Sequence, residues 1–288
     1  MRFAISYSPH FHGLDPDTLI GYARHAEECG FEAIYLPEHI VLYPGAMIGQ
    51  IPFPPTLAIP DPLDTLAFVA AATSRILLGT GVLLLPYHHP VVLAKRLATI
   101  DVLSRGRMRL LTVGLGTLPG EAHATGVDFA TRGRRADEAI DVLRLLWGGG
   151  EEGVSFHGEF FDFDDLTCYP KPYGGAAHLP IHIGGSSRPA ARRAGRRGDG
   201  WFPGGMLTPD ERRAQLDVAR SSAAAAGRDP AALEHTRWAS IDITPERVEA
   251  LAAEGVTRVV VGASGEDEAE RFAQMDALAK RFDLTASA

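Results

Sequence analysis

Glu38 and His39 stand side by side just after an apolar run, Phe31 to Leu36, that is typical of a buried strand. If this run is a parallel strand, its carboxyl end lies on the face of an α/β protein that carries the chemistry. An imidazole exchanges protons near neutral pH, so His39 is a candidate general acid or base. A hydrogen-bonded structural histidine is the alternative that the residue types leave open.

Three glycine-rich segments also follow apolar runs. Gly79-Thr80-Gly81-Val82 and Gly114-Leu115-Gly116 end the two strands of a strand–helix–strand unit that runs from Ile76 to Gly116. Glycine at a strand end lets a ligand approach the backbone closely, although a tight turn explains it equally well. Gly184-Gly185-Ser186-Ser187 precedes a helix, where a serine can cap the helix while free N–H groups bind a phosphate. Both interpretations can hold at this segment.

A metal site is the next candidate, because His10 and His12 follow the first strand in the pattern of barrel metallohydrolases. Such sites need further ligands at later strand ends. The fifth strand offers His182, which lies inside the strand, and the eighth ends in Val261-Gly262-Ala263 without an aspartate. Two histidines without a carboxylate are incomplete for zinc, so we predict no metal ligands.

The other charged residues are expected to be structural or solvated. His88 and His89 precede Pro90 and are expected to shape the start of a helix. Glu138 and Asp141 fall on the exposed face of their helix. Five arginines on the helix after Ser187 form a solvated face in the simplest interpretation; they are Arg188, Arg192, Arg193, Arg196 and Arg197.

Eight strand–helix units must position these residues. The expected strands are 3–5, 31–36, 76–78, 108–113, 179–183, 200–202, 235–243 and 256–261, and the expected helices are 16–30, 64–73, 92–103, 131–147, 189–197, 208–227, 245–254 and 266–282. Residues 43–62 are expected to be a long Pro- and Gly-rich loop that covers a site, and residues 117–130 are another long connection. Residues 149–178 look like a hairpin inserted after the fourth helix. This alternation predicts a (β/α)8 TIM barrel that forms a single domain over residues 1–288.

Composition narrows the class of protein. The 288 residues are 45% hydrophobic, which suits one large α/β barrel, and the net charge of −8 argues against a nucleic-acid partner. Cys29 and Cys168 form neither a disulfide framework nor a metal-ligand spacing. We find no signal peptide and no apolar stretch long enough to span a bilayer. We therefore expect a cytoplasmic protein that acts on a small molecule, without membrane or nucleic-acid partners.

Several motifs occur together between Phe3 and about Trp201. They are Pro37-Glu38-His39-Ile40, Gly79-Thr80-Gly81-Val82, His89-Pro90, Gly114-Leu115-Gly116, Thr131 to Glu138, Ile183-Gly184-Gly185-Ser186 and Gly198-Asp199-Gly200-Trp201. In this combination the chain resembles the bacterial-luciferase-like superfamily of flavin and deazaflavin enzymes. The match is closest to its F420-dependent oxidoreductase branch.

The resemblance implies hydride transfer between C5 of coenzyme F420 and a small organic substrate. His39 would face the reacting carbon, and Glu38 would contact the cofactor. The Gly81–Val82 peptide bond would be cis and form a bulge behind the cofactor ring. The ring would be bounded by Gly81, Val82, Gly114 and Gly116, and the phosphate would be held by Gly184, Gly185 and Ser186.

The resemblance carries further implications outside the cofactor site. Residues 43–62 and the hairpin region would shape the substrate pocket, and some of the five arginines would attract the polyglutamate tail of F420. Members of this family are often homodimers. An FMN-dependent monooxygenase, which would use the same residues and consume oxygen, stays open. A cofactor-binding barrel without turnover also stays open, and a metal-dependent hydrolase is disfavoured by its missing ligands.

Overall fold

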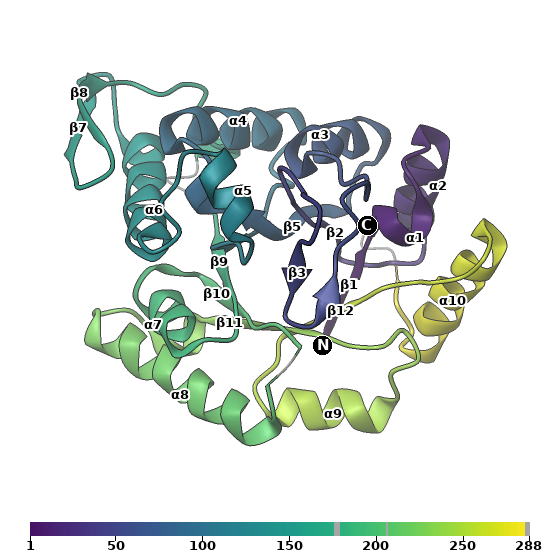
Figure 1. The fold of residues 1–288 in the computed structure, drawn as a ribbon. Coiled ribbons are helices and arrows are strands. Elements are labelled where there is room, and N and C mark those ends of the chain that lie inside the picture. Colours follow the sequence, from purple (N-terminus) through teal and green to yellow (C-terminus); the bar gives the residue numbers. More distant parts are fainter. Residues whose placement is uncertain (176–178, 206, 286–288) are drawn as a thin grey trace.

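A closed barrel of parallel strands forms the centre of the molecule (Figure 1). In the computed structural model, which describes residues 1–175, 179–205 and 207–285, eight strands lie in the order β1-β12-β11-β10-β9-β6-β5-β2. The barrel closes where β1 pairs with β12, with Arg2 opposite Arg258. The strands are β1 (Arg2–Ser6), β2 (Ala33–Leu36), β5 (Leu77–Leu84), β6 (Leu110–Gly114), β9 (Ile181–Gly184), β10 (Gly200–Phe202), β11 (Glu234–Trp238) and β12 (Arg258–Val261).

The strand sequences explain why this sheet is covered on both faces. All residues of β2, β6, β9 and β12 are buried, as expected for parallel strands with helices outside and side chains filling the barrel. Alternate residues point in opposite directions. Ile34 and Leu36 therefore pack in the main core cluster, while Ala33 and Tyr35 pack with Phe202 in a second cluster.

An outer ring of helices surrounds the barrel, and one long helix follows each strand. These are α2 (Pro16–Glu28), α3 (Pro62–Ala72), α4 (Pro90–Leu103), α6 (Arg132–Gly148), α7 (Arg188–Arg197), α8 (Pro209–Ala225), α9 (Pro245–Ala253) and α10 (Glu268–Arg281). Side-chain caps fix the beginnings of most of them, for example Asp15 on α2 and Thr208, in a capping box with Glu211, on α8. None of the helices in the described part of the chain is long and apolar enough to cross a membrane.

The predicted (β/α)8 barrel is confirmed, and the main differences lie in the connections. The long connection 117–130 contains a helix that was not expected, α5 (Pro119–Ala124). Six residues are too few to show a helical period. Residues 43–62 are not structureless either, because β3 (Met47–Ile48) and β4 (Ile51–Pro52) form a small hairpin. Two further short helices follow strand ends, α1 (Pro9–His12) and the 3-10 turn η1 (Leu85–Tyr87).

Several predicted strands are too long. The strand expected over 235–243 ends at Trp238, because Ser240 turns the chain and accepts the Ile243 N–H. The strand expected over 31–36 begins at Ala33. Apolar residues follow Trp238 and precede Ala33, so the hydrophobic pattern alone overestimates the lengths of these two strands.

The segment between α6 and β9 contains an antiparallel hairpin, β7 (Val154–His157) and β8 (Asp162–Leu166). It projects beside α6, away from the β3–β4 hairpin (Figure 1). Two short 3-10 turns, η2 (Tyr173–Gly175) and η3 (Pro230–Ala232), complete the elements. Residues 176–178 of the predicted insertion lie outside the described residues.

The prediction that Glu138 and Asp141 are solvated holds only in part, because the Asp141 side chain is 41% exposed but both carboxylates bind a neighbouring element. The Glu138 carboxylate accepts the backbone N–H groups of Glu159 and Phe160 and ties α6 to the hairpin. Asp141 pairs with Arg197 of α7 at 2.9 Å. One helix period earlier, Asp137 pairs with Arg193 at 2.5 Å. The five arginines are therefore not one solvated face: Arg193 and Arg197 hold α7 to α6, while Arg188, Arg192 and Arg196 are exposed.

Candidate functional site

The candidate cofactor and catalytic residues come together on four neighbouring strands. The strand order β2-β5-β6-β9 places the ends that carry His39, Val82, Gly114 and Gly184 side by side. All four ends are carboxyl ends, because the strands are parallel. In α/β barrels this end carries the active site. The fold thus unites residues that are up to about 145 positions apart in the chain.

A bulge in β5 lies at the centre of this group. The Gly81–Val82 peptide bond is cis, which confirms the expectation, and the pairing with β6 shifts register between Gly81 and Leu83. The Val82 side chain is wedged between two neighbouring strands. A β-carbon at Gly114 would lie 2.5 Å from Val82 Cγ2, and one at Gly184 would lie 2.7 Å from Val82 Cγ1. Both glycines are therefore required for Val82 to occupy this position.

Gly116 and Gly185 need glycine for a second reason. Their φ angles are +75° and +105°, a region that other residues rarely adopt. A β-carbon at Gly116 would also overlap with the Tyr87 hydroxyl. That hydroxyl is buried and has no hydrogen-bond partner among the described residues, and burial raises the pKa of Tyr87 to about 12. Tyr87 is thus an uncharged donor beside the glycine turn that follows β6.

His39 forms a hydrogen-bonded pair with a glutamate that the sequence reasoning missed. His39 Nδ1 lies 3.2 Å from Glu121 Oε2, and the Glu121 side chain is completely buried. The other oxygen, Oε1, accepts the backbone N–H of Ile40 at 2.6 Å. A carboxylate held in this way favours the tautomer with a proton on Nδ1, which leaves Nε2 available as a proton acceptor. The pair has the arrangement of a general base with its orienting group.

Aromatic side chains lie beside His39 and across the barrel mouth from it. The Phe53 ring, from the connection that contains the β3–β4 hairpin, lies 5.4 Å from the His39 ring. Tyr43 of the same connection packs against Gly120 of α5 and accepts its N–H. On the other side of the barrel mouth, Trp238 lies near Gly81 and 5.0 Å from Phe202. These aromatic residues give the mouth an apolar lining, as small-molecule sites usually have.

Glu38 is buried between β2 and the end of β5. Its carboxylate accepts the Leu84 N–H at 2.5 Å and lies 3.0 Å from His88 Nε2. Glu38 thus connects the strand that carries His39 to the segment just after the Val82 bulge. His88 is a partner of this carboxylate, whereas His89 is the N-cap position of α4, as expected for a residue that precedes that helix.

The third glycine segment forms the start of α7. Ser187 is the N-cap and accepts the Ala190 N–H at 3.2 Å, while the Ser186 carbonyl accepts from Gln215. The first N–H groups of an α-helix have no intrahelical partner, and the helix dipole favours an anion there. The exposed Arg188 adds positive charge to this end. The serine cap and the predicted phosphate site are therefore compatible.

The structure argues against a hydrolase metal site after the first strand. Both ring nitrogens of His12 bond to the backbone, Nδ1 with the Ser8 N–H at 3.1 Å and Nε2 with the Ala263 carbonyl at 2.9 Å. His10 is exposed. His182 is buried inside the barrel, and burial lowers its pKa to about 4. These three histidines do not converge on one point.

Comparison with known proteins identifies the family. The luciferase-like monooxygenase family matches residues 1–287. The chain is 35% identical to the F420-dependent hydroxymycolic acid dehydrogenase of Mycobacterium tuberculosis over 220 residues, which is 75% of this chain but only 56% of that relative. It is 31% identical to the F420-dependent glucose-6-phosphate dehydrogenase of Kribbella flavida over 86% of this chain and 77% of the relative.

A solved structure shares the fold along the whole chain. An F420-dependent secondary alcohol dehydrogenase, solved with an F420-acetone adduct, superposes with a TM-score of 0.77 at 18% identity, covering 100% of this chain and 99% of that one. The family match over nearly all residues agrees with the motifs found in the sequence and with the bulge in β5. The chain belongs to the luciferase-like monooxygenase family.

Proposed function

We propose that this protein is an F420-dependent oxidoreductase that transfers a hydride between the deazaflavin C5 and a small organic substrate. The proposal is carried by one observation: the Gly81–Val82 bulge, the His39–Glu121 pair and the start of α7 lie at the same end of neighbouring strands. The two F420-dependent relatives and the F420-dependent structural neighbour support this cofactor. These three F420-dependent proteins are dehydrogenases, so we propose an alcohol or its carbonyl product as the substrate class.

The residues present fit such a cofactor. The Gly81–Val82 bulge would back a flat ring, Gly114 and Gly116 leave room beside it for the Val82 and Tyr87 side chains, and Glu38 holds the backbone behind it. Gly184, Gly185 and Ser186 lead into the α7 N-terminus, which suits a phosphate. When bound, the deazaflavin would supply or accept the hydride, because such redox chemistry belongs to the cofactor.

The protein itself would contribute proton transfer to and from the substrate at His39. Glu121 holds Nδ1, and no described residue forms a hydrogen bond to Nε2. In alcohol oxidation Nε2 would accept the hydroxyl proton, and in carbonyl reduction the protonated ring would return it. The Phe53 ring, which lies beside His39, would help to exclude water from this proton transfer. Residues 43–62 thus form part of the proposed pocket, whereas the β7–β8 hairpin lies beside α6.

The test is a substrate screen with oxidised F420. The protein and F420 are incubated with a panel of primary and secondary alcohols, and loss of the deazaflavin absorbance reports turnover. We expect reduction with at least one alcohol, and H39Q should retain F420 binding but lose turnover. Turnover that is unchanged in H39Q would remove the role of His39, and binding without any turnover would leave a cofactor-binding barrel.

An FMN-dependent monooxygenase is the second candidate, because the matched family is described as monooxygenases. It would use the same bulge and the same α7 N-terminus. Oxygen consumption with reduced FMN and the same panel, without reduction of F420, would favour it.

The exposed arginines of α7 suggest where a polyglutamate tail would lie. Arg193 and Arg197 pair with Asp137 and Asp141, which leaves the exposed Arg188, Arg192 and Arg196 for the tail. R192A should then weaken binding of long-tailed F420 more than binding of the tail-less core. Equal losses for both ligands would refute a role in tail binding.

A further inference from the structure

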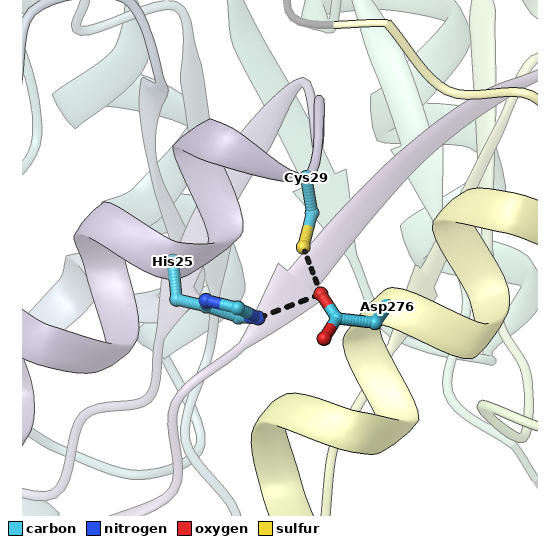
Figure 2. A group of neighbouring side chains, drawn as sticks. All are labelled: His25, Cys29 and Asp276. Atoms are coloured by element: carbon cyan, nitrogen blue, oxygen red, sulfur yellow. Dashed lines mark hydrogen bonds and ion pairs between the residues drawn. The ribbon is translucent and has the colours of Figure 1, made fainter.

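His25, Cys29 and Asp276 converge on the outer surface of the barrel, between α2 and α10 (Figure 2). His25 Nε2 lies 2.9 Å from Asp276 Oδ1, and the Cys29 thiol donates to the same oxygen at 3.3 Å. The three donor atoms all lie within 4.8 Å of one another. His25 and Cys29 are four residues apart, so α2 presents them on one face. Asp276 joins them because the first and last long helices become neighbours when the barrel closes.

The surroundings hold these three side chains in place but leave them accessible. The His25 ring stacks on Phe272 of α10, with centroids 4.0 Å apart and planes 4° apart. The Cys29 side chain is buried, whereas the Asp276 side chain is 63% exposed. A surface cavity of about 370 Å³ borders all three residues. An ion can therefore reach the cluster, and a water molecule can occupy the remaining position.

We propose that His25, Cys29 and Asp276 bind a zinc ion that clamps α2 to α10. An imidazole nitrogen, a thiolate sulfur and a carboxylate oxygen are the donor types that zinc binds, with water as a fourth ligand. Zinc bonds of about 2.0–2.3 Å place tetrahedral donor atoms roughly 3.3–3.8 Å apart. Asp276 Oδ1 lies 2.9 Å from His25 Nε2 and 3.3 Å from Cys29 Sγ, and all three donor atoms lie within 4.8 Å of one another, so shifts of up to about 1 Å would bring them to these distances. On binding, the S–H bond breaks, a sulfur–zinc bond forms and the proton leaves to solvent.

The proposed ion lies outside the barrel, away from the carboxyl strand ends, so its role would be structural. It would connect the helices that follow β1 and β12, the two strands that close the barrel. A ligand that binds only the folded state stabilises it. The expectation from sequence that the chain has no metal ligands missed this cluster, because Asp276 lies 247 positions from Cys29.

The test is titration of the metal-free protein with Co²⁺ and then Zn²⁺. Wild type should bind one Co²⁺ with a thiolate-to-metal charge-transfer band and tetrahedral ligand-field bands, and Zn²⁺ should displace it. C29S should lose the charge-transfer band, while C168S, which alters the other buried cysteine, should keep it. At a zinc concentration 100 times Kd, the wild-type Tm should rise by about 5 °C.

D276N provides a second variant, because Asp276 is exposed and its replacement should not prevent folding. It should weaken Zn²⁺ binding at least tenfold while its Tm in chelator stays near that of wild type. No Co²⁺ binding by folded wild type would overturn the proposal. Binding with spectra that C29S and D276N leave unchanged would overturn it as well, because the ion would then lie elsewhere.

Discussion

Replacing Gly114 by alanine tests whether the Val82 bulge is what the cofactor ring requires. The alanine β-carbon would lie 2.5 Å from Val82 Cγ2 and 3.2 Å from Val82 Cβ. Carbon atoms in contact prefer about 3.5–4.0 Å, so Val82 must move by about 1 Å. Gly114 is buried at the end of β6, where the backbone cannot yield freely.

The magnitude follows from overpacking. Extra atoms in a packed region cost about 1–3 kcal/mol, which in a chain of this size lowers Tm by roughly 2–5 °C. If the displaced Val82 no longer fits the ring, F420 affinity should fall by about tenfold, which corresponds to about 1.4 kcal/mol. Thermal unfolding measures the first effect, and quenching of F420 fluorescence measures the second.

Three further variants separate the local clash from a general loss of fold. V82A/G114A removes the clashing methyl groups and should recover most of the stability, although the ring would still lack its Val82 contact. V82A/G184A should recover less, because a β-carbon at Gly184 also approaches the Val113 carbonyl oxygen at 3.2 Å. G21A in α2, where the new methyl meets only ordinary contacts with Glu268 and Phe272 of α10, should stabilise the protein by about 0.5–1 kcal/mol.

If G114A has the stability and F420 affinity of wild type, Val82 neither clashes with the new β-carbon nor supports the cofactor ring. The same conclusion about the clash follows if V82A/G114A is no more stable than G114A alone. Loss of stability without loss of affinity would keep the packing argument but remove Val82 from the cofactor site.

Two further predictions concern the ion pairs and the buried glutamate. E121Q keeps the shape of the side chain but presents an amide to His39 Nδ1. Turnover should therefore fall by about 10- to 100-fold, while F420 binding changes by less than about threefold. Equal losses of turnover and binding would make Glu121 a structural residue only. R193A should lower the free energy of unfolding, measured in urea, by about 1–2 kcal/mol, because it leaves Asp137 without its partner. R192A should change it by no more than about 0.5 kcal/mol. Similar losses for the two variants would contradict the role of Arg193 in holding α7 to α6.

The fold was predictable because its signals are local. Apolar runs such as Val256 to Val261 end in turns, and helix starts such as Asp15-Pro16 and Thr208-Pro209 carry their caps in the sequence. The order of eight such units leaves few architectures other than a barrel. The glycines at 114 and 184 were also visible, since each follows an apolar run. Their contact with the Val82 side chain depends on the order of the strands in the barrel, so the spacing of residues in the sequence could not predict it.

The residues that were missed depend on long-range packing. Glu121 lies in α5, a helix of six residues that shows no period, and it is paired with a histidine 82 positions earlier. Glu138 and Asp141 looked solvated on a helical projection, but the hairpin and α7 cover that face. A helix period places side chains on a face and does not say what packs against that face.

The most direct test of the proposed function is equilibrium binding of F420 and FMN, in parallel, to the purified apo-protein. Cofactor fluorescence gives both dissociation constants under the same conditions. The proposal predicts that F420 binds at micromolar concentration or tighter and that FMN binds much more weakly. Preference for FMN would contradict it and favour an oxygen-consuming monooxygenase. Binding of neither would limit the resemblance to the fold and remove the roles proposed for His39 and the Gly184 segment.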